Sequence, residues 1–200
     1  MAQVGSRCLV TLDEARDFLK RSTTDDDDAV ALYADLATAL IENRTRRKLK
    51  SRTYDGGANN EPKMLLNGNN LDKILMREYP VTGVTEITAT SYDGTIRTIS
   101  IAALRIIDGG MAIQIPYDIF DKGNANITVT CTAGYLAGFH DQQLSTLKMA
   151  TLRWLQVIWQ YRELAIGRGA NISVGGESVS LLSDAVPKDI LSLIYRYERW

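Results

Sequence analysis

The segment from Gln142 to Ile166 constrains the fold of this chain more than any other stretch. It predicts one helix of about seven turns, with Asp141 as the N-cap and Gly167 as the residue that ends it. Its apolar side chains, placed at about 100° per residue, cover roughly two thirds of the circumference: Leu144, Leu147, Leu152, Trp154, Leu155, Ile158, Trp159 and Tyr161. An ordinary surface helix buries a narrower stripe. We therefore expect this helix to be covered on at least two sides, by its own domain or by a neighbouring subunit.

The overall composition is that of an ordinary globular protein. The chain has 200 residues, of which 45% are hydrophobic, so we expect one compact domain or one domain with an insertion. Its 23 basic residues nearly cancel 24 acidic ones and leave a net charge of -1. A protein that coats nucleic acid normally carries a clear basic excess, so near-neutrality argues against that function.

No stretch of the sequence predicts a targeting signal or a membrane span. The N-terminus MAQVGSRCLV has no basic region followed by a long apolar run. No run reaches the ~18 apolar residues of a transmembrane helix. We expect the chain to be made in a reducing cytoplasm and to have no membrane partner.

Candidate catalytic and metal-ligating residues are few. Cys8 and Cys131 form neither a CxxC pair nor a zinc spacing, and the apolar run around Cys131 predicts a buried free thiol. The single histidine, His140, is expected to form hydrogen bonds at the start of the long helix rather than to act as a base. No phosphate-binding motif is present. We predict no catalytic residue, no metal and no cofactor, and an enzyme with an unrecognised site in the β-rich part of the chain is the weaker alternative.

Residues 1–50 predict an N-terminal pair of helices. Thr11 and Glu14 form a capping box that begins a short helix, which ends near Arg21. The acidic run STTDDDD that follows lacks the alternate spacing and the glycine of a calcium loop. We expect this run to be a negatively charged cap on the second helix, favoured by the helix dipole.

The second helix is predicted from about Asp28 to Leu49, and its C-terminal end is basic. Cations at that end complement the helix dipole. The same side chains are candidates for contact with DNA phosphates: Arg44, Arg46, Arg47 and Lys48.

Residues 51–133 change to the period of β-structure. Turn signals such as Asp93-Gly94 separate short apolar or alternating runs. These runs predict strands at Lys63–Leu66, Ile74–Arg77, Val84–Ser91, Thr95–Ile101, Arg105–Ile107, Ala112–Ile115 and Ile127–Thr132. The pattern is that of a small antiparallel β module set between helices, not of a parallel sheet.

The remaining chain divides at the end of the long helix. Residues 134–167 contain that helix and complete the helical body, and residues 168–200 predict a flexible glycine- and serine-rich arm with a final helix. The predicted fold is α+β: a small helical bundle with one long central helix, an inserted antiparallel β module, and an extended C-terminal arm ending in a helix. The chain closes on YRYERW, and Trp, Tyr and Arg are enriched at binding hot spots. This end either docks on a partner or folds back onto its own core.

Four stretches in combination resemble one family, the head–tail connector (adaptor) proteins of tailed bacteriophages and related gene-transfer particles. The stretch VTLDEARDFLKRSTTDDDDAVALYADLATALIENRTRRKL resembles the opening pair of helices with its acidic run, and LLNGNNLDKILMREYPVTGVTEITATSYDG resembles the β segment. The family's strand and long helix resemble ITVTCTAGY and the long helix that follows it here. The family's terminal helix resembles AVPKDILSLIYRYERW. The segment after Gly134-Tyr135 departs from the family, which often has a proline there.

The resemblance implies a structural virion protein of the neck, present in the host cytoplasm during assembly. Such proteins form a ring of about twelve copies beneath the portal, extend the DNA channel without sequence-specific binding, and dock a stopper, nozzle or other tail component. The terminal segment is then the portal-binding part, which we expect to be dispensable for folding. Its candidate residues are Pro187, Ile190, Leu191, Ile194, Tyr195, Arg196, Tyr197, Arg199 and Trp200.

The helical count adds a candidate subunit interface. Val157, Tyr161 and Leu164 point away from the side of the long helix that carries Leu144 and Leu155. In a ring each copy shows different faces to its two neighbours, so we expect these residues at a subunit boundary. The alternative function is a monomeric or small-oligomer DNA-binding accessory protein of packaging, acting through Arg44–Lys50 and the terminal Arg196 and Arg199.

Overall fold

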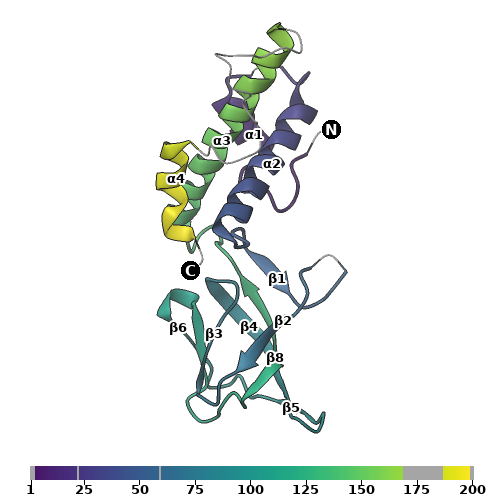
Figure 1. The fold of residues 1–200 in the computed structure, drawn as a ribbon, viewed down its shortest axis with the longest axis vertical. Helices are drawn as coiled ribbons and strands as arrows, with labels where there is room; N and C mark the ends of the chain where they lie inside the picture. The colour runs from purple at the N-terminus through teal and green to yellow at the C-terminus, as the bar shows by residue number, and fades with distance from the viewer. Residues whose placement is uncertain (1–2, 22, 59, 169–186, 199–200) are drawn as a thin grey trace, which may run out of the picture. The chain divides into compact units, whose positions relative to one another are not determined.

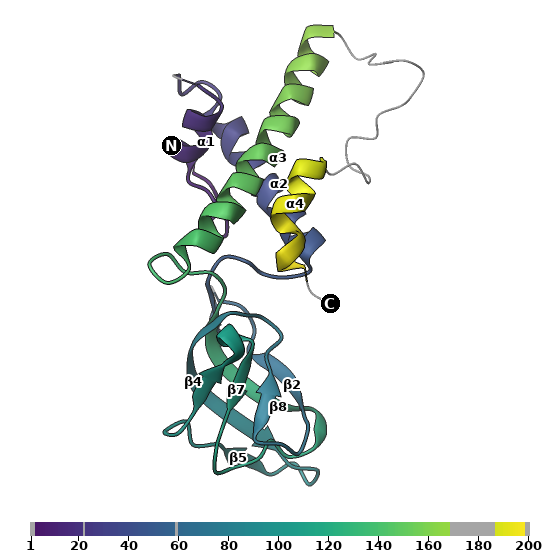
Figure 2. The ribbon, with the colours of Figure 1, turned by 90° about the vertical axis from the view of Figure 1, so that its left-hand side faces the viewer.

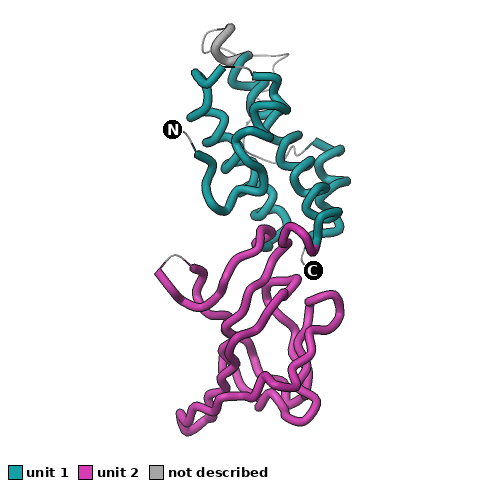
Figure 3. The backbone as a smooth tube through the Cα atoms, turned by 180° about the vertical axis from the view of Figure 1, so that it is seen from behind, with its two compact units in different colours: residues 1–47, 140–200 teal, residues 48–139 magenta. Residues whose placement is uncertain are grey.

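A computed structural model describes residues 3–21, 23–58, 60–168 and 187–198, without the side chains of residues 164–168. The chain forms two compact units, a helical unit of residues 1–47 and 140–200 and a β unit of residues 48–139 (Figure 3). In the sequence, the β unit is thus inserted between two helices of the helical unit. Within the described residues, no helix is both long and apolar enough to cross a membrane.

The helical unit contains α1 (Leu12–Phe18), α2 (Asp27–Thr45), α3 (Asp141–Arg168) and α4 (Lys188–Ile194), followed by a single 3-10 turn (Tyr195–Tyr197) (Figure 1). The first three helices share a core. Small side chains of α2, including Ala34 and Ala37, let α3 approach closely, and Leu155 and Trp159 fill the space between them. The residues at which each helix begins and ends determine which of its side chains can pack in this core.

The capping box of α1 is present as the sequence predicts. The Glu14 amide donates to Thr11 Oγ1 over 3.2 Å, and the Thr11 amide donates to Glu14 Oε2 over 2.8 Å. These two bonds satisfy amide groups that the first turn leaves without a helical partner. Partial burial raises the pKa of the Glu14 carboxyl, but the contact with Lys148 of α3 and the bond from the Thr11 amide together outweigh it, so this pKa lies below its usual range.

The other helix ends differ from the predicted ones. α2 ends at Thr45 rather than Leu49, because Arg46 adopts the left-handed conformation with φ 55°. α3 begins at Asp141 and continues through Gly167 to Arg168. A glycine ends a helix only where the backbone turns to positive φ, and inside a helix it costs about 1 kcal/mol.

The β unit contains two antiparallel sheets. The larger has the order β1 (Arg52–Tyr54), β8 (Gly123–Ala133), β4 (Val81–Thr90), β5 (Ile96–Thr98), and β2 (Met64–Gly68) also pairs with β8. The smaller has the order β3 (Lys73–Leu75), β7 (Ala112–Gln114), β6 (Arg105–Ile107), with a 3-10 turn at Asp108–Gly110. Every pair of strands in these sheets is antiparallel. The predicted α+β class is therefore confirmed.

Alternation along the strands builds the core of the β unit. β2 buries Met64 and Leu66 while Leu65 is exposed, and β8 buries every second residue from Ile127 to Ala133. Cys131 lies in this series as a buried free thiol, as predicted, and burial raises its pKa to about 12. Cys8 is also a buried free thiol, in the core of the helical unit.

Candidate docking surfaces

The terminal helix α4 packs against α3 within the helical unit (Figure 2). Ile190 and Ile194 are fully buried and Tyr197 is 3% exposed. The Tyr197 hydroxyl donates to the Gln143 carbonyl over 3.4 Å. These three side chains belong to the core of their own unit, and their binding to a portal stays a prediction. Removing them would also remove core packing, which argues against the expectation that the segment is dispensable for folding.

Two arginines of the predicted DNA-contacting group hold the end of α4 instead. Arg47 is 3% exposed, and its Nη1 donates to the Tyr197 carbonyl over 3.2 Å. Arg44 Nε lies 3.1 Å from Glu198 Oε1. The guanidinium of Arg47 is thus buried and bonded to backbone, and its contact with DNA phosphates stays a prediction. Arg46 and Lys48 are exposed.

The outward side of α4 carries the remaining candidates for docking. Tyr195 is 61% exposed, Arg196 is exposed and Leu191 is half-buried. Pro187 is the N-cap of the helix and is half-buried. The predicted residues Arg199 and Trp200 lie outside the described residues.

The long helix α3 has buried side chains over about half of its circumference. Leu147, Ala150, Thr151, Leu155 and Trp159 are buried. The predicted interface residues Val157 and Tyr161 are half-buried, and the side chain of Leu164 lies outside the description.

A cluster around Trp159 ties the start of α2 to α3. The guanidinium carbons of Arg21 and Arg162 lie 4.9 Å and 4.6 Å from the centre of the Trp159 ring. The Trp159 indole N–H donates to Glu163 over 2.8 Å, and Arg162 pairs with Asp26 at 3.0 Å. Part of the acidic run thus forms ion pairs with arginine side chains. The sequence pattern indicates only that the negative charges of the run interact favourably with the helix dipole.

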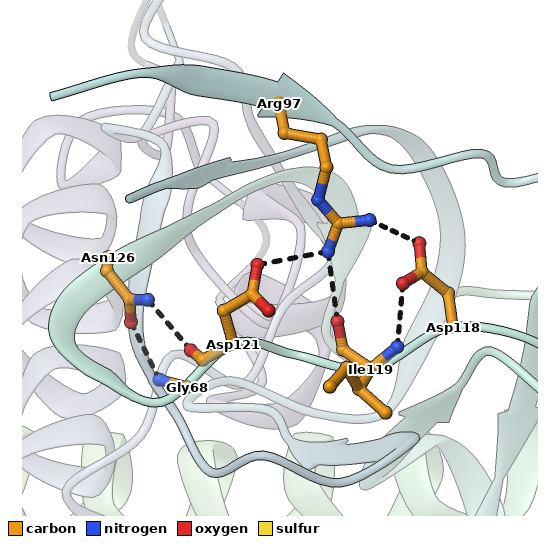
Figure 4. Close-up of polar contacts among 6 residues, drawn as sticks. All are labelled: Gly68, Arg97, Asp118, Ile119, Asp121 and Asn126. Carbon is orange, nitrogen blue, oxygen red and sulfur yellow. Dashed lines mark hydrogen bonds and ion pairs between the residues drawn. The ribbon is translucent and has the colours of Figure 1, made fainter. Parts of the chain in front are cut away.

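A second polar cluster holds the loop between β7 and β8 (Figure 4). Arg97 of β5 donates to Asp118 over 2.6 Å, to the Ile119 carbonyl over 3.2 Å and to Asp121 over 3.1 Å. The bond from Arg97 is the main cause that lowers the pKa of Asp118. Because two carboxylates offset the arginine charge, this cluster fits a structural role better than the binding of an anion.

Asn126 extends this second cluster to β2. Its side-chain amide donates to the Asp121 carbonyl over 2.8 Å, and its oxygen accepts from the Gly68 amide over 2.9 Å (Figure 4). Gly68 is required there, because a Cβ on it would lie 1.8 Å from the Asp121 carbonyl oxygen.

Within the described ranges, no group of three His, Cys, Asp or Glu side chains is arranged to hold a metal ion. The backbone carbonyl of His140 accepts a hydrogen bond from the Leu144 amide over 2.8 Å at the start of α3.

Two solved structures and one family model match nearly the whole length of this chain. The structure of the neck of an empty GTA (gene transfer agent) particle, determined with C6 symmetry, contains a chain of similar fold. The TM-score is 0.61 and the identity 21%, over 98% of this chain and 93% of the other. In the neck of a native GTA particle, determined with C12 symmetry, the TM-score is 0.57 and the identity 21%, over 94% and 87%. No curated protein matches the chain.

The family model described as "Head completion protein" matches residues 8–200. Its span includes both units and the terminal helix. Together with the neck-protein fold, it confirms the resemblance to head–tail connector proteins that the sequence carries. The chain belongs to the head completion protein family.

Proposed function

We propose that this protein is a head–tail connector that closes the filled head and joins it to the next component of the neck or tail. The observation that carries the proposal is the family match over residues 8–200. Family and fold support a structural component of the particle neck, not an enzyme.

The protein acts as a ring of about twelve copies beneath the portal. Support comes from the sixfold and twelvefold symmetry of the neck structures that contain the similar fold. The ring extends the channel through which double-stranded DNA passes. A net charge of -1 suits that role, since many exposed cations in a channel would bind phosphates and retard the DNA.

The outward side of α4 contacts the portal. It presents Tyr195 and Arg196 beside the half-buried Leu191. Aromatic and arginine side chains around an apolar contact are the residue types that dominate binding energies at protein interfaces. The buried side of the same helix keeps this surface in place without taking part in the contact.

The test is binding of the purified protein to portal-containing heads. The double variant Tyr195→Ala/Arg196→Ala removes only exposed side chains, and we expect it to fold normally and to bind the heads at least about tenfold more weakly. Tyr92→Ala is the matched control, because Tyr92 is a fully exposed tyrosine of the β unit. Binding of the double variant with the affinity of the wild-type protein would show that α4 is not the portal contact.

A further inference from the structure

Helix α2 has a second apolar side that is not part of the core. Its core side carries Val30, Ala34 and their neighbours. Leu32, Leu36 and Leu40 follow one another at four-residue spacing on the other side, at about 100° per residue. Leu32 is 64% exposed, and Leu36 and Leu40 are half-buried. We call this row of three leucines the α2 stripe. By the helical count Leu32 lies opposite Val30, and Leu36 and Leu40 lie progressively nearer to Tyr33, which packs on Trp159 of α3.

Helix α3 carries a row of the same spacing, the α3 stripe, which consists of Arg153, Val157 and Tyr161. By the helical count it faces away from Leu155 and Trp159, the side chains that pack on α2. The two stripes are consequently different surfaces of the helical unit.

The terminal helix shows what kind of contact the α3 stripe accepts. Gln143 lies on the same side of α3 as the stripe by the helical count, and Tyr197 contacts its carbonyl. Ala150, on the same side, is fully buried. α3 continues past the first turn of α4 (Figure 2). Val157 and Tyr161, which follow Ala150 along α3, are half-buried. The α3 stripe thus extends a surface that is already used for helix packing.

The two stripes also carry opposite charges at corresponding positions. Asp28 precedes Leu32 by four residues, as Arg153 precedes Val157. Both charged side chains are exposed. Within the described part of the chain, neither of these two side chains forms an ion pair or hydrogen bond. Opposite charges at corresponding positions of two surfaces fix the register of a contact between them and disfavour other partners.

We propose that the α2 stripe of one copy packs on the α3 stripe of the next copy in the ring, with Asp28 beside Arg153 of the partner subunit. This inference rests on the ring of the proposed function. Rows at four-residue spacing on both helices interdigitate at a defined crossing angle. Two different surfaces of one unit give a heterologous contact, which repeats around a closed ring.

A charge exchange tests the pairing during assembly on portal-containing heads. Asp28→Arg and Arg153→Asp each place like charges together, so we expect each to raise the protein concentration needed for ring formation by roughly tenfold or more. The double variant Asp28→Arg/Arg153→Asp restores opposite charges and should form rings near the wild-type concentration. Asp13→Arg is the matched control, because Asp13 is also an exposed acid in the first turn of a helix.

Cross-linking tests the geometry of the contact. The native cysteines are buried, so a bismaleimide should react chiefly at introduced cysteines. A chain with both Asp28→Cys and Arg153→Cys should give a ladder of covalent oligomers up to the full ring on heads. Either single variant alone should give no ladder, and a mixture of the two single variants should stop at dimers.

Separate outcomes distinguish this inference from the proposed function. If the wild-type protein forms neck rings and the two single charge variants do so equally well, the pairing is wrong and the function stands. Loss of rings with Arg153→Asp but not with Asp28→Arg means that another segment occupies the α3 stripe, which also overturns the pairing. If the wild-type protein never enters the neck, the proposed function fails, and the inference fails with it.

Discussion

Gly68 shows how a single backbone position fixes the loop before β8. Its amide bonds Asn126, which in turn bonds the Asp121 carbonyl. The close approach of Gly68 to that carbonyl leaves no space for a side chain. Arg97 holds the same loop from the other side through Asp118 and Asp121. The loop is thus fixed by several hydrogen bonds to two strands.

Gly68→Ala should therefore destabilise the protein. The added Cβ meets backbone rather than a flexible side chain, and we expect the free energy of unfolding to fall by about 1–3 kcal/mol. Gly83→Ala in β4 is the control, because a Cβ there has nothing within 4 Å. It should change the free energy of unfolding by less than about 1 kcal/mol. Urea denaturation followed by circular dichroism measures both variants, and equal stabilities would contradict the close approach.

The sequence predicts some residue environments and not others. The apolar alternation around Cys131 predicts its burial from local pattern alone, and the structure confirms it. Arg47 and Arg97 offered no such signal. Arg47 bonds a carbonyl 150 residues away, and Arg97 pairs with carboxylates that follow it by 21 and 24 residues. The local sequence predicts that a charged residue in a basic or polar stretch is exposed, because its partner lies far away in the sequence.

At the scale of elements, α4 carries both buried side chains and exposed side chains that we propose for docking. Its periodicity correctly predicts a helix, but the apolar residues look the same whether they meet their own core or another protein. The structure resolves this for Ile190, Ile194 and Tyr197, which are buried. The exposed Tyr195 lies beside them in sequence.

Ile194→Ala and Tyr195→Ala should accordingly separate stability from binding. Ile194 is fully buried, so its truncation should lower the free energy of unfolding by about 2–5 kcal/mol. Tyr195→Ala should change the free energy of unfolding by less than about 0.5 kcal/mol, while weakening attachment to heads. Chemical denaturation and a head-binding assay measure the two effects. A large loss of stability in Tyr195→Ala would contradict the separation of the two sides of α4.

The elements with strong periodicity are predicted best. The capping box places the start of α1, and the dipeptide turn signals separate most of the strands correctly. The sequence does not predict β1, because its three residues, Arg52–Tyr54, carry no apolar alternation, and they pair with the far end of β8. The end of α2 was misplaced because the left-handed turn at Arg46 involves no glycine or asparagine.

For the whole molecule, the two apolar sides of α3 explain why the helix has so wide an apolar circumference. One side of α3 packs on α2, and another side packs on α4. Further along this second side, Val157 and Tyr161 are half-buried. The sequence predicts this excess of apolar surface, but it did not show that α4 covers part of it.

We propose that this chain is a ring-forming connector of the particle neck. Cryo-electron microscopy of assembled particles, with the neck reconstructed without imposed symmetry, tests it most directly. We predict a closed ring of copies of this chain at the junction between head and tail, with α2 of each copy against α3 of the next. A neck without this chain, or with a single unpaired copy of it, would contradict the account.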